Sequence, residues 1–143
     1  RFFMAGSGDM LVHVIRRVAK LGIADRFHFT GFLRGDEVQK MFGMSDVYVM
    51  PSVSEPFGIS PLEAMKSNVP VIISKQSGVA EVLDYAIKVD YWDVDAMADA
   101  IYGLLKYPSL AAMSAEKGKS EVINLKWDNA AGEVLDVYRS LVG

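Results

Sequence analysis

The chain has 143 residues, 51% of them apolar, which suits one domain with a buried core and excludes a disordered chain. Its 15 Lys and Arg against 18 Asp and Glu give a net charge of −3, so the charge offers no reason to bind nucleic acid, and no nucleic-acid partner is expected. The absence of cysteine excludes a disulfide framework and fits a reducing compartment, so we expect a cytoplasmic protein.

Five short apolar segments are predicted to be β-strands, because they are rich in β-branched and aromatic residues and mostly end at Gly, Pro or Ser. Segments with helical spacing lie between them, and from residue 107 onward only helices are predicted. Alternation of strand and helix implies a parallel sheet covered by helices on both faces. The predicted strands are residues 1–6, 26–31, 46–51, 70–74 and 86–90.

Three features define the predicted helices. In residues 9–22 the apolar side chains share one face, and Gly22 can end the helix in a left-handed conformation. Asp36 is a plausible N-cap for the next helix, and Asp93 for the helix over 93–107. The Asp93 and Asp95 pair resembles a metal-binding triplet, but capping explains it better. The shared apolar faces are formed by Leu11, Val14, Ile15, Val18 and Leu21, and near the C-terminus by Val134, Leu135, Tyr138 and Leu141.

Two glutamates flank a short turn after the third predicted strand. Glu55 precedes Pro56, which favours extended backbone and so aims the Glu55 side chain reproducibly. Gly58 leaves room for a ligand to approach the main chain, and Glu63 lies in the helix that follows. In an open α/β sheet, ligands bind beyond the carboxyl ends of the strands, so this loop is a candidate ligand site.

A purely structural explanation covers part of this pattern. Ser60, Pro61 and Glu63 fit the N-cap, N1 and N3 positions of a capping box, which would account for Glu63 without any ligand. On local chemistry alone, both the capping box and a ligand site explain Glu63. The capping box leaves Glu55 unexplained, because a bare carboxylate at the end of an apolar strand requires a partner.

The stretch from Glu55 to Glu63, with Pro-Phe-Gly after the first glutamate and "EAM" around the second, resembles the signature of retaining group 1 glycosyltransferases of the glycogen synthase type. Further blocks resemble the same family in family order, namely "MAGSGD", "FHFTGFL", "SDVYVMPS", "NVPVIIS", "SGVAEVL" and the region of Trp127. The resemblance implies an α/β fold, the Rossmann-like C-terminal half of a GT-B enzyme. The domain 1–143 would bind the nucleotide-sugar, and the N-terminal acceptor domain would be absent.

The resemblance also implies residue roles. Glu55 would act catalytically near the reacting carbon of the donor sugar, and Glu63 would accept hydrogen bonds from the ribose hydroxyls. The donor sugar and diphosphate would be held by backbone amides of Phe57, Gly58, Ile59 and Ser60. The nucleotide base would lie against a loop formed by Gly6, Gly8, Phe32 and Leu33.

The family comparison implies no metal and no cofactor, since the nucleotide-sugar is a substrate. The acceptor, whether a saccharide, a lipid-linked molecule or another compound, would be bound mainly by the N-terminal domain, and membrane association of the full-length enzyme is left open. The family also has a strand and helix before "MAGSG" that supply an Arg and a Lys to the diphosphate. Without that first strand-helix unit, we expect the 143 residues to be inactive alone.

Two other functions bear on the same residues. A nucleotide or nucleotide-sugar binding module without catalysis fits the same residues. A dinucleotide-binding domain is disfavoured, because Thr30 and Gly31 stand where an acidic ribose ligand is expected.

Overall fold

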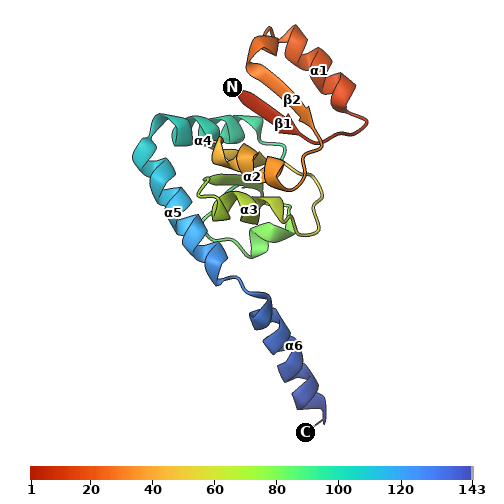
Figure 1. The fold of residues 1–143 in the computed structure, drawn as a ribbon, viewed down its shortest axis with the longest axis vertical. Coiled ribbons are helices and arrows are strands. Elements are labelled where there is room, and N and C mark those ends of the chain that lie inside the picture. The colour runs from red at the N-terminus through yellow and green to blue at the C-terminus, as the bar shows by residue number, and fades with distance from the viewer. Residues whose placement is uncertain (143) are drawn as a thin grey trace. The chain divides into compact units, whose positions relative to one another are not determined.

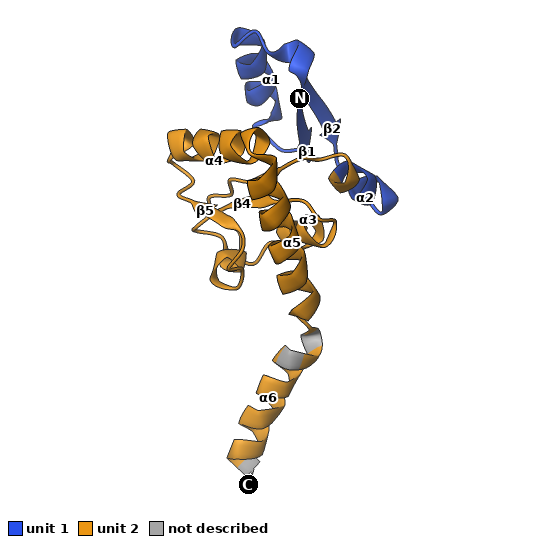
Figure 2. Cartoon of the chain, turned by 90° about the vertical axis from the view of Figure 1, so that its left-hand side faces the viewer, with its two compact units in different colours: residues 1–41 blue, residues 42–143 orange. Residues whose placement is uncertain are grey.

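A computed structural model describes residues 1–142, without the side chains of Trp127, Asn129 and Val142. The predicted domain 1–143 therefore ends on Gly143, outside the described residues, and the Trp127 side chain of the resemblance also lies outside them. The chain divides into two compact units, residues 1–41 and 42–143 (Figure 2). None of the helices in the described range is both long and apolar enough to cross a bilayer.

The first unit is built on two parallel strands, β1 (Phe2–Ala5) and β2 (Phe27–Gly31). They are joined by α1 (Leu11–Lys20), as Figure 1 shows, and by a short 3-10 turn, η1 (Ala24–Arg26). The rings of Phe2 and Phe27 stack across the strands with centroids 5.6 Å apart. This short parallel ladder confirms the first two predicted strands.

The helix α1 ends as the sequence predicts. Gly22 adopts a left-handed conformation with φ 69°, and its amide donates to the carbonyl of Ala19. Val18 is buried, but Ile15 and Leu21 are exposed, so the predicted apolar face is only partly covered. The strand β1 is exposed along its whole length, and within residues 1–142 it pairs with β2 alone.

The second unit contains a three-stranded parallel sheet in the order β3-β4-β5, formed by Tyr48–Met50, Val71–Ser74 and Ile87–Val89. The helix α2 (Asp36–Gly43) precedes it and crosses the boundary between the units. The remaining elements are α3 (Ser60–Lys66), η2 (Gly78–Glu81), α4 (Val94–Lys106), α5 (Pro108–Asn124) and α6 (Trp127–Val142). All five predicted strands are present, and every strand pair is parallel.

Alternate residues of β3, β4 and β5 point to opposite faces of this sheet, and both faces are covered. On one face, Ile72 and Val89 pack against Leu104 of α4. On the other face, Tyr48 contacts Phe42 of α2 edge to face and bonds Ser60 of α3. The central strand β4 is therefore buried throughout, which explains its continuous run of apolar residues.

The helix boundaries correct some of the predicted caps. Asp93 is the N-cap of α4 and accepts a hydrogen bond from the Ala96 amide at 2.9 Å, as predicted. Asp36 is instead the first residue inside α2, and the Glu37 carboxylate accepts from the amide of Arg34. Two helices follow α4, as predicted, but the apolar face expected on α6 is exposed, at Val134, Leu135, Tyr138 and Leu141.

Candidate functional site

The loop after β3, residues 51–59, carries Glu55 at the carboxyl end of the sheet. The backbone of Glu55 forms a parallel bridge with Ser77, and its carbonyl accepts a hydrogen bond from the Gly78 amide at 2.9 Å. Its side chain is half-buried. Glu55 is therefore held by the main chain of a second loop, in addition to the restraint from Pro56 that the sequence indicated.

That second loop, residues 75–79, is called the bracing loop. It lies against residues 52–57: the Val79 amide donates to the Phe57 carbonyl at 2.8 Å, and a Cβ on Gly78 would lie only 2.0 Å from the Pro56 carbonyl oxygen. At its start, the buried hydroxyl of Ser74 donates to the carbonyl of Ser52 at 2.6 Å. Only glycine fits this close approach of two backbones.

Glycine is favoured at position 58 both by its backbone conformation and by the close packing around it. Its φ of 92° lies in a region that side chains disfavour. A Cβ at Gly58 would lie 3.1 Å from Cγ of Glu55 and 3.1 Å from Cε of Met50. The space beside Gly58 is thus occupied by the protein's own side chains, and the glycine lets Glu55 fold back over the turn.

The capping box that was one of the two explanations for Glu63 does not form. The N-cap of α3 is Ile59, which makes no side-chain cap, and the Ser60 hydroxyl bonds instead to the Tyr48 hydroxyl at 2.7 Å. Within residues 1–142, the amides at positions 57 to 60 donate no hydrogen bond to another residue. These donors are available to a ligand with acceptor oxygens.

Glu63 lies in α3 and is half-buried, with its amide bonded to the carbonyl of Ile59 at 3.1 Å. Since Ser60 does not cap the helix, Glu63 is not one half of a reciprocal capping pair. In the described part of the chain, neither the Glu63 nor the Glu55 carboxylate has a hydrogen-bond or ion-pair partner. Two half-buried glutamates whose carboxylates have no partner among the described residues can bind hydroxyl groups.

Tyr48 links this part of the site electrostatically. Burial raises the pKa of the Tyr48 phenol, the bond with Ser60 opposes that rise, and the charges of Glu55 and Glu63 add to it. The phenol therefore remains neutral at physiological pH and well into the alkaline range. The charges of both glutamates thus act on the Tyr48 phenol, which also bonds the hydroxyl of Ser60.

In the first unit, the glycine loop after β1 lines a hollow of about 210 Å³, with Gly6, Ser7 and Gly8 among its lining residues. Gly6 has φ 115°, and its amide donates to the Gly31 carbonyl at 2.7 Å. Gly8 has open space where a side chain would begin. The backbone conformation thus requires glycine at position 6, whereas at Gly8 no contact with the described residues requires it.

Phe32 and Leu33 follow the carboxyl end of β2, next to Gly31 and hence beside the glycine loop. Phe32 is 69% exposed, and the Arg34 guanidinium lies 5.3 Å from its ring centroid. Leu33 is half-buried. The structure thus gathers the predicted residues in two groups, one in each unit.

The remaining sequence signals have structural explanations. His28 stacks on Phe3 with ring centroids 5.4 Å apart, and Asp93 caps α4. No cluster of three His, Asp or Glu side chains able to hold a metal occurs within residues 1–142. The sequence marked the loop at "SGVAEVL" only through the family resemblance, and did not indicate that it contacts Glu55 or that Tyr48 contacts Ser60. The signal available for the contact with Glu55 was Gly78, which lies shortly after the buried strand β4 ends at Ser74, at the same edge of the sheet as Glu55.

A family model for group 1 glycosyl transferases matches residues 1–121. An uncharacterised glycosyltransferase of Methanocaldococcus jannaschii is 33% identical over 144 residues, covering 97% of this chain and 37% of the relative. This chain thus spans little more than a third of that relative.

Solved structures share the fold. Sucrose-phosphate synthase from Thermosynechococcus elongatus has a TM-score of 0.80 at 27% identity, over 97% of this chain and 38% of that one. HepE of Anabaena, solved with UDP-glucose, has a TM-score of 0.82 at 18% identity, over 96% of this chain and 40% of that one. The parallel strands and helices therefore form the α/β fold of a GT-B C-terminal domain, as the sequence predicted.

Proposed function

The chain belongs to the group 1 glycosyltransferases, and we propose that it binds the nucleotide-activated sugar donor and, joined to an N-terminal domain, transfers the sugar with retention of configuration. The observation that carries this proposal is a pair of half-buried glutamates, Glu55 and Glu63, flanking four backbone amides; within residues 1–142 the two carboxylates have no partner and the four amides have no acceptor. The solved complex of HepE with UDP-glucose supports a nucleotide-sugar as the ligand class.

Each end of the donor would meet a different kind of group. The Glu63 carboxylate accepts hydrogen bonds from two adjacent ribose hydroxyls, which suits a group with acceptors only. The amides at positions 57 to 60 donate to the sugar and the diphosphate, whose charge they stabilise with fixed dipoles. The loop of Gly6, Gly8, Phe32 and Leu33 would provide room and main-chain groups for the base.

Glu55 would act at the reacting carbon. As the bond to the diphosphate breaks, positive charge develops on the sugar ring, and a carboxylate beside that ring stabilises it. Glu55 suits this role because its backbone is held by Ser77 and Gly78 and its carboxylate has no competing partner in the described residues. A carboxylate fixed before the reaction needs no rearrangement when the charge appears.

The diphosphate must also be stabilised as it leaves. In this proposal the amides at positions 57 to 60 do so from this chain, together with an Arg and a Lys from an upstream strand and helix, and no metal is needed. The acceptor, of saccharide, lipid-linked or other chemistry, would bind mainly to the N-terminal domain.

Isothermal titration of the chain with UDP, GDP and ADP tests the binding step. We expect one nucleotide to bind, and Glu63→Ala to weaken that binding about tenfold or more, because two charge-assisted hydrogen bonds are lost. Glu116→Ala is the matched control, since Glu116 is an exposed glutamate on α5. Circular dichroism establishes that each variant is folded.

Equal binding by wild type and Glu63→Ala would contradict the ribose role of Glu63. If no nucleotide binds, the same titrations on a protein with the upstream strand and helix decide whether phosphate contacts were lacking. In the protein joined to its N-terminal domain, Glu55→Ala should abolish transfer and retain nucleotide binding. Wild-type binding without transfer there would favour the non-catalytic module.

A further inference from the structure

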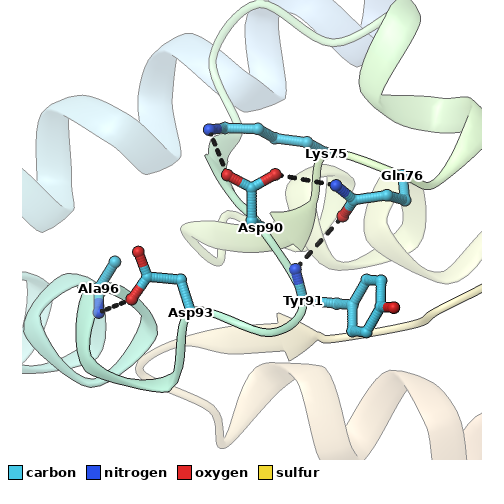
Figure 3. Close-up of polar contacts among 6 residues, drawn as sticks. All are labelled: Lys75, Gln76, Asp90, Tyr91, Asp93 and Ala96. Carbon is cyan, nitrogen blue, oxygen red and sulfur yellow. Dashed lines mark hydrogen bonds and ion pairs between the residues drawn. The ribbon is translucent and has the colours of Figure 1, made fainter.

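A polar cluster at the carboxyl ends of β4 and β5 centres on Asp90. One oxygen of its carboxylate accepts from Nζ of Lys75 at 2.9 Å, and the other accepts from Nε2 of Gln76 at 2.8 Å. Oε1 of Gln76 accepts from the amide of Tyr91 at 3.3 Å, so both ends of the Gln76 amide are used (Figure 3). Asp90 thus holds two successive residues of the neighbouring segment.

Those two residues begin the bracing loop. A backbone hydrogen bond also holds the start of this loop, since the Lys75 amide donates to the Val89 carbonyl at 2.9 Å. Three residues further along, the Gly78 and Val79 amides donate to the carbonyls of Glu55 and Phe57. A continuous series of contacts therefore runs from the Asp90 carboxylate through the bracing loop to the backbone of Glu55.

We propose that Asp90 is a positioning residue that fixes the backbone of Glu55 through the bracing loop. The proposal rests on the function proposed above, since Glu55 is there the carboxylate beside the donor sugar. Exposed ion pairs contribute little to global stability, so the effect of Asp90 is local. It restricts the conformations of Lys75 and Gln76, and thereby keeps the loop against Glu55.

The two glutamates are held differently, which gives the proposal a distinct consequence. Glu63 belongs to α3, and its amide bonds to Ile59, so its position does not depend on the bracing loop. Glu55 depends on that loop through Gly78. Loss of Asp90 should therefore weaken contacts to the donor sugar and spare those to the nucleoside.

Amide hydrogen exchange measures, without any ligand, how firmly the bracing loop is bonded to residues 55–57. In Asp90→Ala, the Gly78 and Val79 amides should exchange about tenfold faster than in wild type, while the Leu83 amide, bonded to the Val79 carbonyl at 3.1 Å, serves as reference. Asp90→Asn should show a smaller change, because it keeps an acceptor for Gln76. Asp93→Ala is the matched control, since the Asp93 side chain accepts from the Ala96 amide at the start of α4 (Figure 3), and its own amide, which donates to the Asp90 carbonyl, is kept in the variant.

Titration then measures the consequence for the ligand. UDP and UDP-glucose, or GDP and GDP-mannose if the guanine nucleotide binds, are compared in wild type, Asp90→Ala and Asp93→Ala. Asp90→Ala should lower the affinity for the nucleotide-sugar about fivefold or more relative to the free nucleotide. Asp93→Ala should leave that ratio unchanged. General unfolding would weaken both ligands equally, so the ratio separates positioning from stability.

Unchanged exchange at Gly78 and Val79 in Asp90→Ala would overturn the proposal, and so would an unchanged affinity ratio in a binding-competent chain. If wild type binds none of these compounds, with or without the upstream segment, the proposed function fails. The exchange rates then still decide whether Asp90 fixes the Glu55 backbone.

Discussion

The sheets of the two units differ sharply in burial. In the second unit, Val71, Ile72 and Ile73 of the central strand are 0% exposed, whereas in the first unit Phe2 and Phe3 are 50% and 46% exposed. Burying apolar surface contributes about 25 cal/mol per Å², so the second unit gains far more from its strands. Two strands alone are marginally stable in water. The glutamates are therefore carried by a well-packed core, and the glycine loop by a thin sheet.

Removing core volume should reveal this difference most strongly. Ile72→Ala deletes a fully buried side chain between β3 and β5 and should lower the free energy of unfolding by about 2–5 kcal/mol. Phe3→Ala, on the exposed strand β1, should cost less than about 1 kcal/mol. Urea denaturation followed by circular dichroism measures both. Equal losses would mean that the two sheets contribute alike to stability.

The next largest difference is expected between glycine substitutions in the bracing loop and in the glycine loop after β1. Gly78→Ala places a methyl group against the Pro56 carbonyl and should cost about 1–3 kcal/mol, because two backbones must move apart. Gly8→Ala meets open space and should leave stability nearly unchanged, while weakening nucleotide binding if the proposed base loop is correct. Thermal unfolding and nucleotide titration provide the two readouts. A stable Gly78→Ala variant with unaltered binding would contradict the tight contact between the loops.

A smaller effect is expected at the start of α4. Asp93→Ala removes the side chain that accepts from the Ala96 amide and should cost about 1 kcal/mol of stability. Asp95→Ala, inside the same helix, should cost a few tenths of a kcal/mol, by loss of a favourable interaction with the helix dipole. Thermal melts of the two variants compare them directly. A larger loss for Asp95→Ala would assign it a role other than that of a first-turn residue.

The smallest effect should be a pH dependence at Tyr48. Because the folded-state pKa of Tyr48 is raised, its stabilising contribution is complete below the unfolded pKa of about 10 and is lost as the pH rises through the folded value. Tyr48→Phe should remove this alkaline loss, and at pH 7 it should cost only about 0.5 kcal/mol through the bond to Ser60. Urea denaturation between pH 7 and 11 measures both variants. An unchanged alkaline slope would place the responsible group elsewhere.

Much of the fold could be predicted because each strand is a short run of β-branched and aromatic residues that can be recognised without knowing its partners. All five predicted strands and their parallel pairing are confirmed, and so are Gly22 and Asp93 at helix ends. The faces of α1 and α6 were harder, because periodicity shows which side chains share a face and not whether anything covers it. Ile15 and Leu141 are both exposed.

The candidate site was only partly predictable for the same reason. The spacing of Glu55, Gly58 and Glu63 identified the loop and the family, and the family is confirmed by the match over residues 1–121. The individual roles of the site residues stay predictions. Ser60 shows the limit: its sequence fits a capping box, yet a partner twelve residues earlier, Tyr48, takes its hydroxyl.

The sequence by itself determined the element order, the parallel pairing and the family, because these follow from short-range patterns of apolar, turn and capping residues. Only the tertiary structure decided that Ser60 bonds Tyr48, that Gly78 fits beneath Pro56, and that Asp90 reaches Lys75. Each of these contacts joins residues brought together by the packing of parallel strands. Their distances depend on sheet register and loop path, which no local spacing encodes.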